Sequence, residues 1–301
     1  MDTDLLLGGQ SGGVTVLMGT KQGKYPSSNS LQVTGSLGSL LIDPSVDVYE
    51  RGGAPATIDR VVVSHAHEDH LAGIGRFPQA RVCAHRLDVG ALHALEGLLD
   101  VYGMPEPMRS TWAEQLRTDF HYTPRTDATS FEDGEVFDLG GRTVTVIHLP
   151  GHTRGHCGFL IEPDGVFFVA DIDLSSFGPY YGDHWSDLED FERAMDKSAE
   201  VDARWYVTSH HKGVIDGKPQ FTEALKSFRS VIAARDQRLL AFLSEPRTLA
   251  AIVDYRIIYR PGTSGVLWID HVEANSAQMH LNRLIRNGAV AQLESGQFRA
   301  Q

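Results

Sequence analysis

The chain has 301 residues, of which 42% are hydrophobic and 22% are charged, a composition typical of a globular protein and unlike that of a disordered chain. Its 39 acidic residues outnumber the 27 basic ones, and the net charge of −12 disfavours binding to nucleic-acid phosphates. The two cysteines, Cys83 and Cys157, are too few for a disulfide framework and favour a reducing compartment.

The N-terminal residues, MDTDLLLGGQSGG, begin with acids and contain only a short apolar run. They lack the basic region and the long apolar region of a signal peptide. No run of about 18 apolar residues occurs, so we expect no membrane span. These features together predict a cytoplasmic protein.

The first third of the chain is expected to contain short strands and one helix. Apolar and β-branched residues in 13–19, 30–35 and 39–45 are broken by Gly, Pro, Asn and Ser, a pattern typical of strands and turns. Further strands are predicted in RVVVSHAH (60–67) and ARVCAH (80–85). Helical spacing over 86–103 then predicts a helix that ends at its last glycine, at position 103.

The middle of the chain predicts an insertion followed by two hairpins. Residues 104–130 are polar and contain three prolines, and we interpret them as a lid beside the functional site. Hairpins are predicted to turn at Gly140-Gly141 and at Asp164-Gly165.

The following segments predict a helix, a strand and a second helix. Residues 186–201 have an amphipathic pattern, with Ser186 as the expected N-cap. RWYVTSHH (204–211) predicts another strand, and 221–243 predict a long closing helix.

These elements form two successive sets of strands followed by helices. The pattern predicts two sheets packed face to face with helices outside, a four-layer αββα sandwich over residues 1–240. We expect residues 241–301 to form a separate helical, winged-helix-like module, because a helix, Gly288 and a small hairpin follow one another there. Basic and acidic residues nearly balance in this module, so a structural or cavity-covering role is expected rather than nucleic-acid binding.

The segment VVVSHAHEDHLAG (61–73) places three histidines and two acids directly after a buried strand. His65 and His67, two positions apart, can direct two imidazoles at one metal ion. Asp69 and His70 open the following helix and can face a second ion about 3.5–4 Å from the first. Two such ions can share a hydroxide that attacks an ester-like carbon.

Other candidate ligands also follow apolar strands. They are His152 after TVTVIHLPG, Asp171 after GVFFVA, and the adjacent pair His210 and His211 after RWYVTS. All of these strand ends can converge on one edge of the sheets, so the sequence predicts one metal centre built from distant segments.

The motifs SHAHEDH, PGHTRGH, VAD and TSHH occur in the order found in the metallo-β-lactamase superfamily, which the chain resembles from about residue 10 to 235. GHTRGHCGFLIE is similar to the glyoxalase II-like branch, and the C-terminal module to the tail of thioesterase-like and endoribonuclease-like members. The resemblance implies a first metal held by His65, His67 and His152. It implies a second metal held by Asp69, His70 and His210 or His211, with Asp171 as the bridge. The small residue before His210 favours that histidine.

The resemblance also implies the chemistry. We expect a zinc-dependent hydrolase with two Zn²⁺ per chain, with iron or manganese as alternative metals. A metal-bridging hydroxide would cleave a thioester, lactone or related ester-like bond, with Asp69 holding the second metal and accepting a proton. Typical zinc β-lactamases lack a bridging aspartate, so Asp171 disfavours antibiotic hydrolysis. Two alternatives stay open, a mononuclear iron oxidoreductase acting on a sulfur substrate and an endoribonuclease of the same fold.

The aromatic segment 175–185 is expected to contact a small-molecule substrate, with Tyr180, Tyr181 and His184 as candidates. No motif identifies that substrate, and the oligomeric state stays open, with a homodimer as one option.

Three residues near the motifs have expected roles outside the ligand set. His156 is expected to fix the turn that presents His152. Asp43 follows a predicted strand and either orients a ligand or caps a turn. Glu68 lies between ligands in the sequence and is expected to face solvent.

Overall fold

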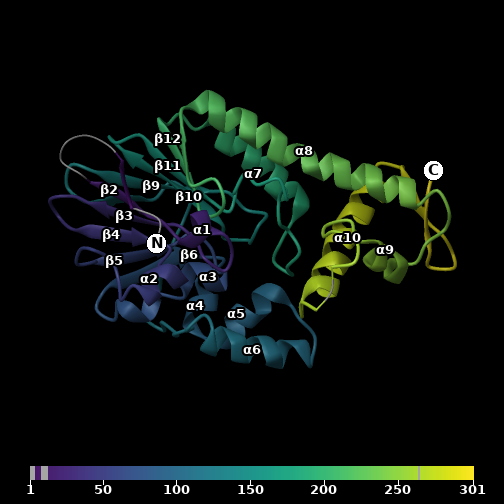
Figure 1. The fold of residues 1–301 in the computed structure, drawn as a ribbon, viewed down its shortest axis with the longest axis horizontal. Helices are drawn as coiled ribbons and strands as arrows, with labels where there is room; N and C mark the ends of the chain where they lie inside the picture. The colour runs from purple at the N-terminus through teal and green to yellow at the C-terminus, as the bar shows by residue number, and fades with distance from the viewer. Residues whose placement is uncertain (1–3, 8–12, 264) are drawn as a thin grey trace.

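The computed structural model describes residues 4–7, 13–263 and 265–301. Two β-sheets pack face to face and helices cover their outer faces, which confirms the predicted four-layer αββα sandwich (Figure 1). The first sheet runs in chain order through β1 (Leu5–Leu7), β2 (Val14–Leu17), β3 (Ser30–Thr34), β4 (Ser39–Ile42), β5 (Arg60–Val63), β6 (Arg81–His85) and β7 (Thr129–Phe131). The second runs through β13 (Val214–Asp216), β12 (Trp205–Thr208), β11 (Val166–Ala170), β10 (Cys157–Glu162), β9 (Thr143–His148) and β8 (Val136–Asp138).

Continuous apolar strands are buried on both faces because the sandwich has helices outside both sheets. In β5, Val62 faces the second sheet, whereas Val61 and Val63 face the helices. In β11, Phe168 faces the first sheet, and Phe167 faces the helices on the opposite side. Successive side chains of a strand point to opposite faces, so these runs supply two cores at once.

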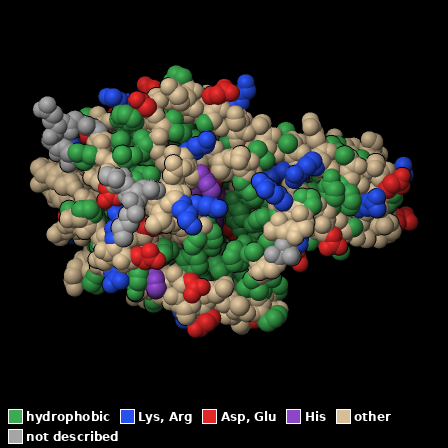
Figure 2. Space-filling model, in the orientation of Figure 1, with side chains coloured by type: hydrophobic (Ala, Val, Ile, Leu, Met, Phe, Trp, Pro, Cys, Tyr) green, Lys and Arg blue, Asp and Glu red, His purple; other side chains and the backbone are tan. Residues whose placement is uncertain are grey.

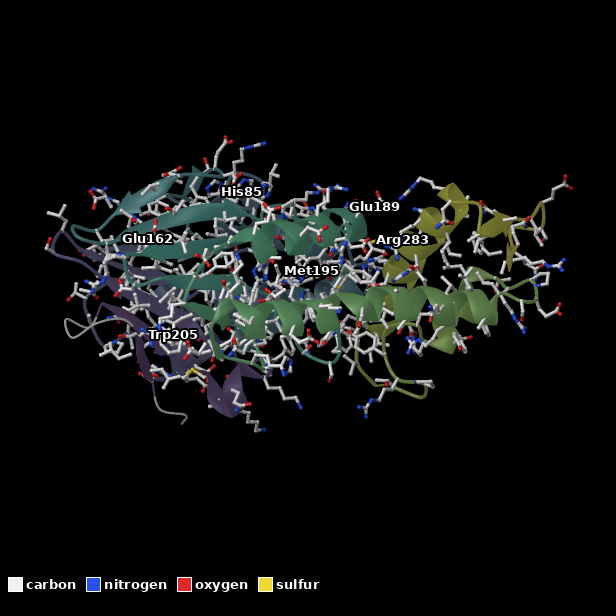
Figure 3. The ribbon with its side chains drawn as sticks, turned by 90° about the horizontal axis from the view of Figure 1, so that it is seen from above. His85, Glu162, Glu189, Met195, Trp205 and Arg283 are labelled. Carbon is white, nitrogen blue, oxygen red and sulfur yellow. The ribbon has the colours of Figure 1, made fainter. Side chains whose placement is uncertain are left out.

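The helices divide between the two outer faces. The face of the first sheet is covered by α2 (Val46–Glu50), α3 (Glu68–Leu71), α4 (Gly90–His93), α5 (Leu95–Tyr102) and α6 (Met108–Thr118). The face of the second sheet is covered by α7 (Leu188–Glu200) and α8 (Lys218–Phe242), with Met195 of α7 lying between these two helices (Figure 3). Two short turns, α1 (Thr20–Gly23) and a 3₁₀ helix (Ile74–Arg76), complete this part.

Three sequence predictions about helices need correction. The helix predicted over 86–103 is two helices, because the backbone at Ala94 is extended, although it ends at the left-handed Gly103 as predicted. The segment 104–130, predicted as a lid or insertion beside the functional site, is not an irregular loop, because it contains the helix α6, whose Trp112 is buried. The N-cap of α7 is Asp187 and not the predicted Ser186. The side chain of Asp187 accepts a hydrogen bond from the backbone N–H of Asp190.

The C-terminal residues pack on the end of α8, which extends beyond the sandwich (Figure 1). They form α9 (Leu249–Tyr255), α10 (Ile269–Arg286) and a hairpin of β14 (Val290–Gln292) and β15 (Phe298–Ala300). Glu189 on α7 and Arg283 on α10 lie where these helices meet (Figure 3), and Arg283 contacts Glu192 at 2.7 Å. The predicted domain boundary at 240/241 falls in the last turn of α8 and stays a prediction. None of the helices in the described part of the chain has both the length and the apolar character that crossing a bilayer requires.

Arg235 of α8 holds the loop that follows β11. Its side chain is 2% exposed. It donates hydrogen bonds to the carbonyl oxygens of Pro179 (2.6 Å) and Phe177 (2.8 Å) and to the hydroxyl of Tyr181 (2.7 Å). That hydroxyl also lies 2.9 Å from Nε2 of His280 on α10. A buried guanidinium therefore connects the loop to the C-terminal module.

We expect Arg235→Met to lower the free energy of unfolding by about 3 kcal/mol, because buried carbonyls lose a charged donor that Met cannot replace. Urea denaturation followed by circular dichroism measures the change. Arg229→Met, on the exposed side of α8, is the control and should change stability by no more than about 0.5 kcal/mol. Equal midpoints for the two variants would contradict the anchoring role.

Candidate metal centre

The ends of four strands bring the predicted ligands to one edge of the sandwich. β11 and β12 are parallel, and β9 runs in the same direction because β10 is antiparallel to both β9 and β11. The segments after β9, β11 and β12 therefore deliver His152, Asp171 and His210 to the same edge. The loop after β5 brings His65 and His67 to this edge from the first sheet.

Three overlapping groups of ligand atoms form there among the described residues: two that share no residue, and a third, His65, His70 and Asp171, that overlaps both. In the first group, the ligand atoms of His65, His67 and His152 all lie within 4.8 Å of one another, and Nε2 of His65 is 3.1 Å from Nδ1 of His67. The second group contains Asp69, His70 and His210. Both groups are buried, and either set of three could hold a metal ion.

Asp171 lies between the two groups. Its Oδ2 is 3.3 Å from Nε2 of His152 in the first group and 3.5 Å from Nε2 of His210 in the second. Its Oδ1 is 3.2 Å from Nε2 of His70. This is the position that a bridging carboxylate requires.

Several atoms of the centre are buried without a hydrogen-bond partner among the described residues. They are Oδ2 of Asp69, Nε2 of His70, Nε2 of His152 and Oδ1 of Asp171. Buried polar atoms are normally paired, so a convergent set of unpaired ones indicates a missing partner. Imidazole and carboxylate donors suit zinc, and also iron or manganese, so the residues fit a metal centre.

The electrostatics of the centre also indicate a place for cations. Burial lowers the pKa values of His70 and His210, but the carboxylates of Asp69 and Asp171 outweigh burial and hold both values well above the usual range. Burial and the neighbouring His70 lower the pKa of His65 well below its usual range. The carboxylates thus favour positive charge at this place, which a bound metal ion would supply.

Asp43 orients two of the histidines, which decides between the roles considered for it. Its Oδ2 accepts a hydrogen bond from Nδ1 of His70 at 2.9 Å and another from the hydroxyl of Ser64 at 2.6 Å. The same hydroxyl lies 2.9 Å from Nδ1 of His65. With Nδ1 engaged, Nε2 of each ring is left to face the centre.

Backbone carbonyls orient His152 and His210 in the same way. Nδ1 of His152 donates to the carbonyl oxygen of Tyr180 at 2.9 Å, and Nδ1 of His210 donates to that of Ser27 at 3.0 Å. Nε2 of His67 lies 3.0 Å from Oδ2 of Asp183, so in this residue Nδ1 faces the first group.

A cavity of about 350 Å³ opens onto both groups, and Figure 2 shows a hollow with many hydrophobic side chains. Tyr102, Met104 and Trp112 form one wall, whereas Trp268 and Ile269 come from the C-terminal module. The rings of Trp112 and Trp268 are 5.2 Å apart, so the module closes one side of the cavity, as its expected covering role requires.

The family model of the metallo-beta-lactamase superfamily matches residues 26–210, more than half of the chain. The chain belongs to the metallo-β-lactamase superfamily. This finding confirms the resemblance seen in the motifs.

Superfamily relatives differ in function and match only part of the chain. The acyl-coenzyme A thioesterase MBLAC2 of Gallus gallus is 29% identical over 117 residues, which are 37% of this chain and 40% of the relative. The hydroxyacylglutathione hydrolase of Aeromonas hydrophila is 27% identical over 144 residues, 46% of this chain and 43% of the relative. The chain thus spans less than half the length of these curated relatives. The crystal structure of metallo-beta-lactamase family protein TTHA1429 from Thermus thermophilus shares the fold over 96% of this chain and 99% of its own, with a TM-score of 0.69 and 22% identity.

The remaining candidate ligands and substrate residues occupy different positions relative to the ligand groups and the cavity. Nε2 of His210 is 3.2 Å from Asp69, whereas its neighbour His211 lines the cavity outside the ligand groups. Tyr180 lines the cavity, but Tyr181 is buried against Arg235 and does not. The third candidate substrate residue, His184, is exposed and borders a separate pocket.

His156 and Glu68 show one expectation met and one overturned. His156 donates from Nδ1 to the carbonyl of Leu149 and accepts the backbone N–H of Asp171 at Nε2, so it fixes the turn as expected. Burial lowers its pKa to about 3, which keeps it neutral. Glu68 was expected to face solvent, but it is 5% exposed because Tyr25 and Tyr102 cover it and donate hydroxyl hydrogen bonds to its carboxylate.

Two buried aspartates of the site, Asp183 and Asp88, were missed in the sequence because each lies far along the chain from the groups it contacts. Asp88 accepts hydrogen bonds from the backbone N of Ala66 (2.9 Å), the hydroxyl of Thr153 (2.7 Å) and the backbone N of Gly155 (2.7 Å). It therefore joins the two turns that carry the first ligand group. Their only sequence signal is an acid near an apolar segment, which is common on surfaces.

We expect Asp88→Asn to weaken metal binding about 10- to 100-fold, because the amide N–H₂ would face a backbone donor and disturb both ligand turns. Competition with a fluorescent chelator measures the affinity. Asp202→Asn, whose side chain is 91% exposed, is the matched control and should bind as the parent does. If Asp88→Asn also bound metal as the parent does, Asp88 would not position the ligands.

Proposed function

We propose that the chain is a binuclear-metal hydrolase that cleaves the thioester bond of a small acyl substrate. The observation that carries this proposal is the pair of ligand groups sharing Asp171 at the floor of an apolar cavity. Similarity to an acyl-coenzyme A thioesterase and to a hydroxyacylglutathione hydrolase supports a thioester as the substrate.

Each residue of the centre has a proposed role. His65, His67 and His152 would hold one divalent ion, preferably zinc. Asp69, His70 and His210 would hold the other, and Asp171 would contact both. When bound, such ions polarise a carbonyl oxygen and lower the pKa of water to about 7. Asp69, which is buried beside His210 and His70, would accept a proton during turnover.

The cavity walls suit an acyl chain. Aromatic and apolar side chains of α5, α6 and the C-terminal module surround the space above the ligand groups. Burial of each methylene of a substrate in such a space contributes about 0.8 kcal/mol, so a chain of several carbons gains substantial binding energy. The walls also limit access of water around the reacting carbonyl.

The second ligand group favours this proposal over its main alternative. A mononuclear iron oxidoreductase would need the first group alone, yet Asp69, His70 and His210 also converge with their ligand atoms together. An endoribonuclease would bind RNA with an affinity that falls strongly as the salt concentration rises. A filter-binding assay at two salt concentrations tests this alternative.

Elemental mass spectrometry of the purified protein, paired with turnover of a generic acyl thioester, tests the proposed function. We expect two zinc ions per chain with hydrolysis, and for His67→Ala a loss of nearly all turnover without unfolding, because the first group loses a ligand. His184→Ala changes an exposed histidine outside the cavity and should keep parental kcat/KM. One iron per chain without hydrolysis, or full turnover by His67→Ala, would contradict the proposal.

We expect Trp268→Ala to raise KM for a long-chain acyl thioester about tenfold with little change in kcat, because apolar wall area is lost away from the ligand groups. Steady-state kinetics measure both constants. Leu267→Ala removes an adjacent side chain that is 36% exposed and outside the cavity wall, and serves as the control. An unchanged KM for Trp268→Ala would show that the C-terminal module does not contact the acyl chain.

A further inference from the structure

The charged residues that line the cavity are all of one sign, histidines aside. Five carboxylates border it: Glu68, Asp69, Asp171, Asp173 and Asp183. Among the described residues that line the cavity, none is Lys or Arg. The residues outside the described ranges contain neither amino acid, so they do not alter this count of positive charges.

Asp69 and Asp171 belong to the ligand groups, and the other three carboxylates lie beside them in the wall. Glu68 is held by the hydroxyls of Tyr25 and Tyr102. Asp183 accepts a hydrogen bond from the hydroxyl of Tyr180 at 3.3 Å and lies beside the ring of His67.

Asp173 is held less completely than the other two. Its Oδ1 accepts the backbone N–H of Ser175 at 2.8 Å, and its side chain borders the cavity. All three carboxylates are therefore fixed by neutral donors or by an imidazole and not by a Lys or Arg of the described chain.

The sign of this wall has a consequence for substrate binding. The metal ions that Asp69 and Asp171 would hold offset the charge of these two residues, so the uncompensated negative charge of the wall belongs to the other three carboxylates. A carboxylate at the end of an acyl group would lose water on entering, meet these three carboxylates and find no Lys or Arg among the described lining residues as a partner. A cation at the same place would be attracted by the carboxylates and could lie over the faces of Tyr25, Tyr102 or Trp112. An uncharged acyl group would pack against the apolar side chains at no such cost.

We propose that the cavity selects acyl groups by the sign of their charge, accepting uncharged and cationic acyl groups and rejecting anionic ones. Glu68 is a specificity-determining residue, because two tyrosines hold its carboxylate at the cavity wall next to the second ligand group. This inference rests on the proposed thioester hydrolysis and adds a substrate class to it.

Three thioesters with one neutral leaving group, N-acetylcysteamine, test the selectivity. Their acyl groups share the same run of methylenes and end in a carboxylate (heptanedioyl), a tert-butyl group (7,7-dimethyloctanoyl) or a trimethylammonium group (6-trimethylammoniohexanoyl). The last two have the same shape. We expect kcat/KM for the carboxylate to be lower than for both others by about tenfold or more.

Two other outcomes would overturn the charge selectivity, and a third would overturn the proposed thioester hydrolysis. The inference would be overturned if kcat/KM for the carboxylate-terminated thioester lay within about threefold of that for the tert-butyl-terminated thioester. It would also be overturned if kcat/KM for the trimethylammonium-terminated thioester were as low as that for the carboxylate-terminated one, because the cavity would then reject charge of either sign through desolvation alone. Hydrolysis of none of the three esters would instead overturn the proposed function, and the selectivity with it.

Glu68→Gln tests the residue and keeps the size of the side chain. We expect the ratio of kcat/KM for the tert-butyl ester to that for the carboxylate ester to fall at least about threefold, because one carboxylate of the wall is removed. Glu114→Gln makes the same change in net charge on the exposed face of α6 and should keep the parental ratio. Metal content and thermal unfolding identify a variant that has lost its centre. An unchanged ratio in a folded, metal-loaded Glu68→Gln variant would show that Glu68 does not determine the selectivity.

Discussion

The carboxylate of Asp171 lies between imidazoles from three distant parts of the chain, and the two sheets have to meet for this arrangement to exist. His70 follows strand β5 of the first sheet, whereas His152 follows β9 and His210 follows β12 of the second sheet. Burying these groups costs several kcal/mol per charge unless opposite charges lie close by. The carboxylate of Asp171 lies close to these imidazoles, and its negative charge is one of the causes that raise the pKa values of His70 and His210.

The surrounding structure can be understood as support for this expensive cluster. Asp43 and Asp88 connect ligand turns that would otherwise be independent loops, and both do so through hydrogen bonds that are fully buried. Strands with apolar residues on both faces place the cluster at the edge of a double core, where the backbone is held firmly. Rigid support of this kind keeps the imidazole nitrogens directed at one point.

The C-terminal module contributes to the site from a distance. Trp268 reaches the cavity beside Trp112, and Arg235 and His280 fix the loop that carries Tyr180 and Asp183. One half of α8 thus packs on the second sheet, and the other half packs on the C-terminal module. The C-terminal module therefore supplies one wall of the cavity, whereas the ligand groups stand at strand ends of the sandwich.

The order of strands and the residues that follow them were readable from the amino-acid pattern, because apolar runs and adjacent His and Asp residues are local features. The four-layer fold and the membership in the superfamily followed from them. The motif favoured His210 over His211, but the local pattern could not decide between them, because adjacent residues on an irregular turn point in different directions that only the packed neighbours define. Nor could it show that Glu68 is buried, since Tyr25 and Tyr102 that cover it lie 43 and 34 residues away along the chain. Asp88 and Asp183 acquire their meaning in the same way, through contacts with distant segments that form when the chain is folded.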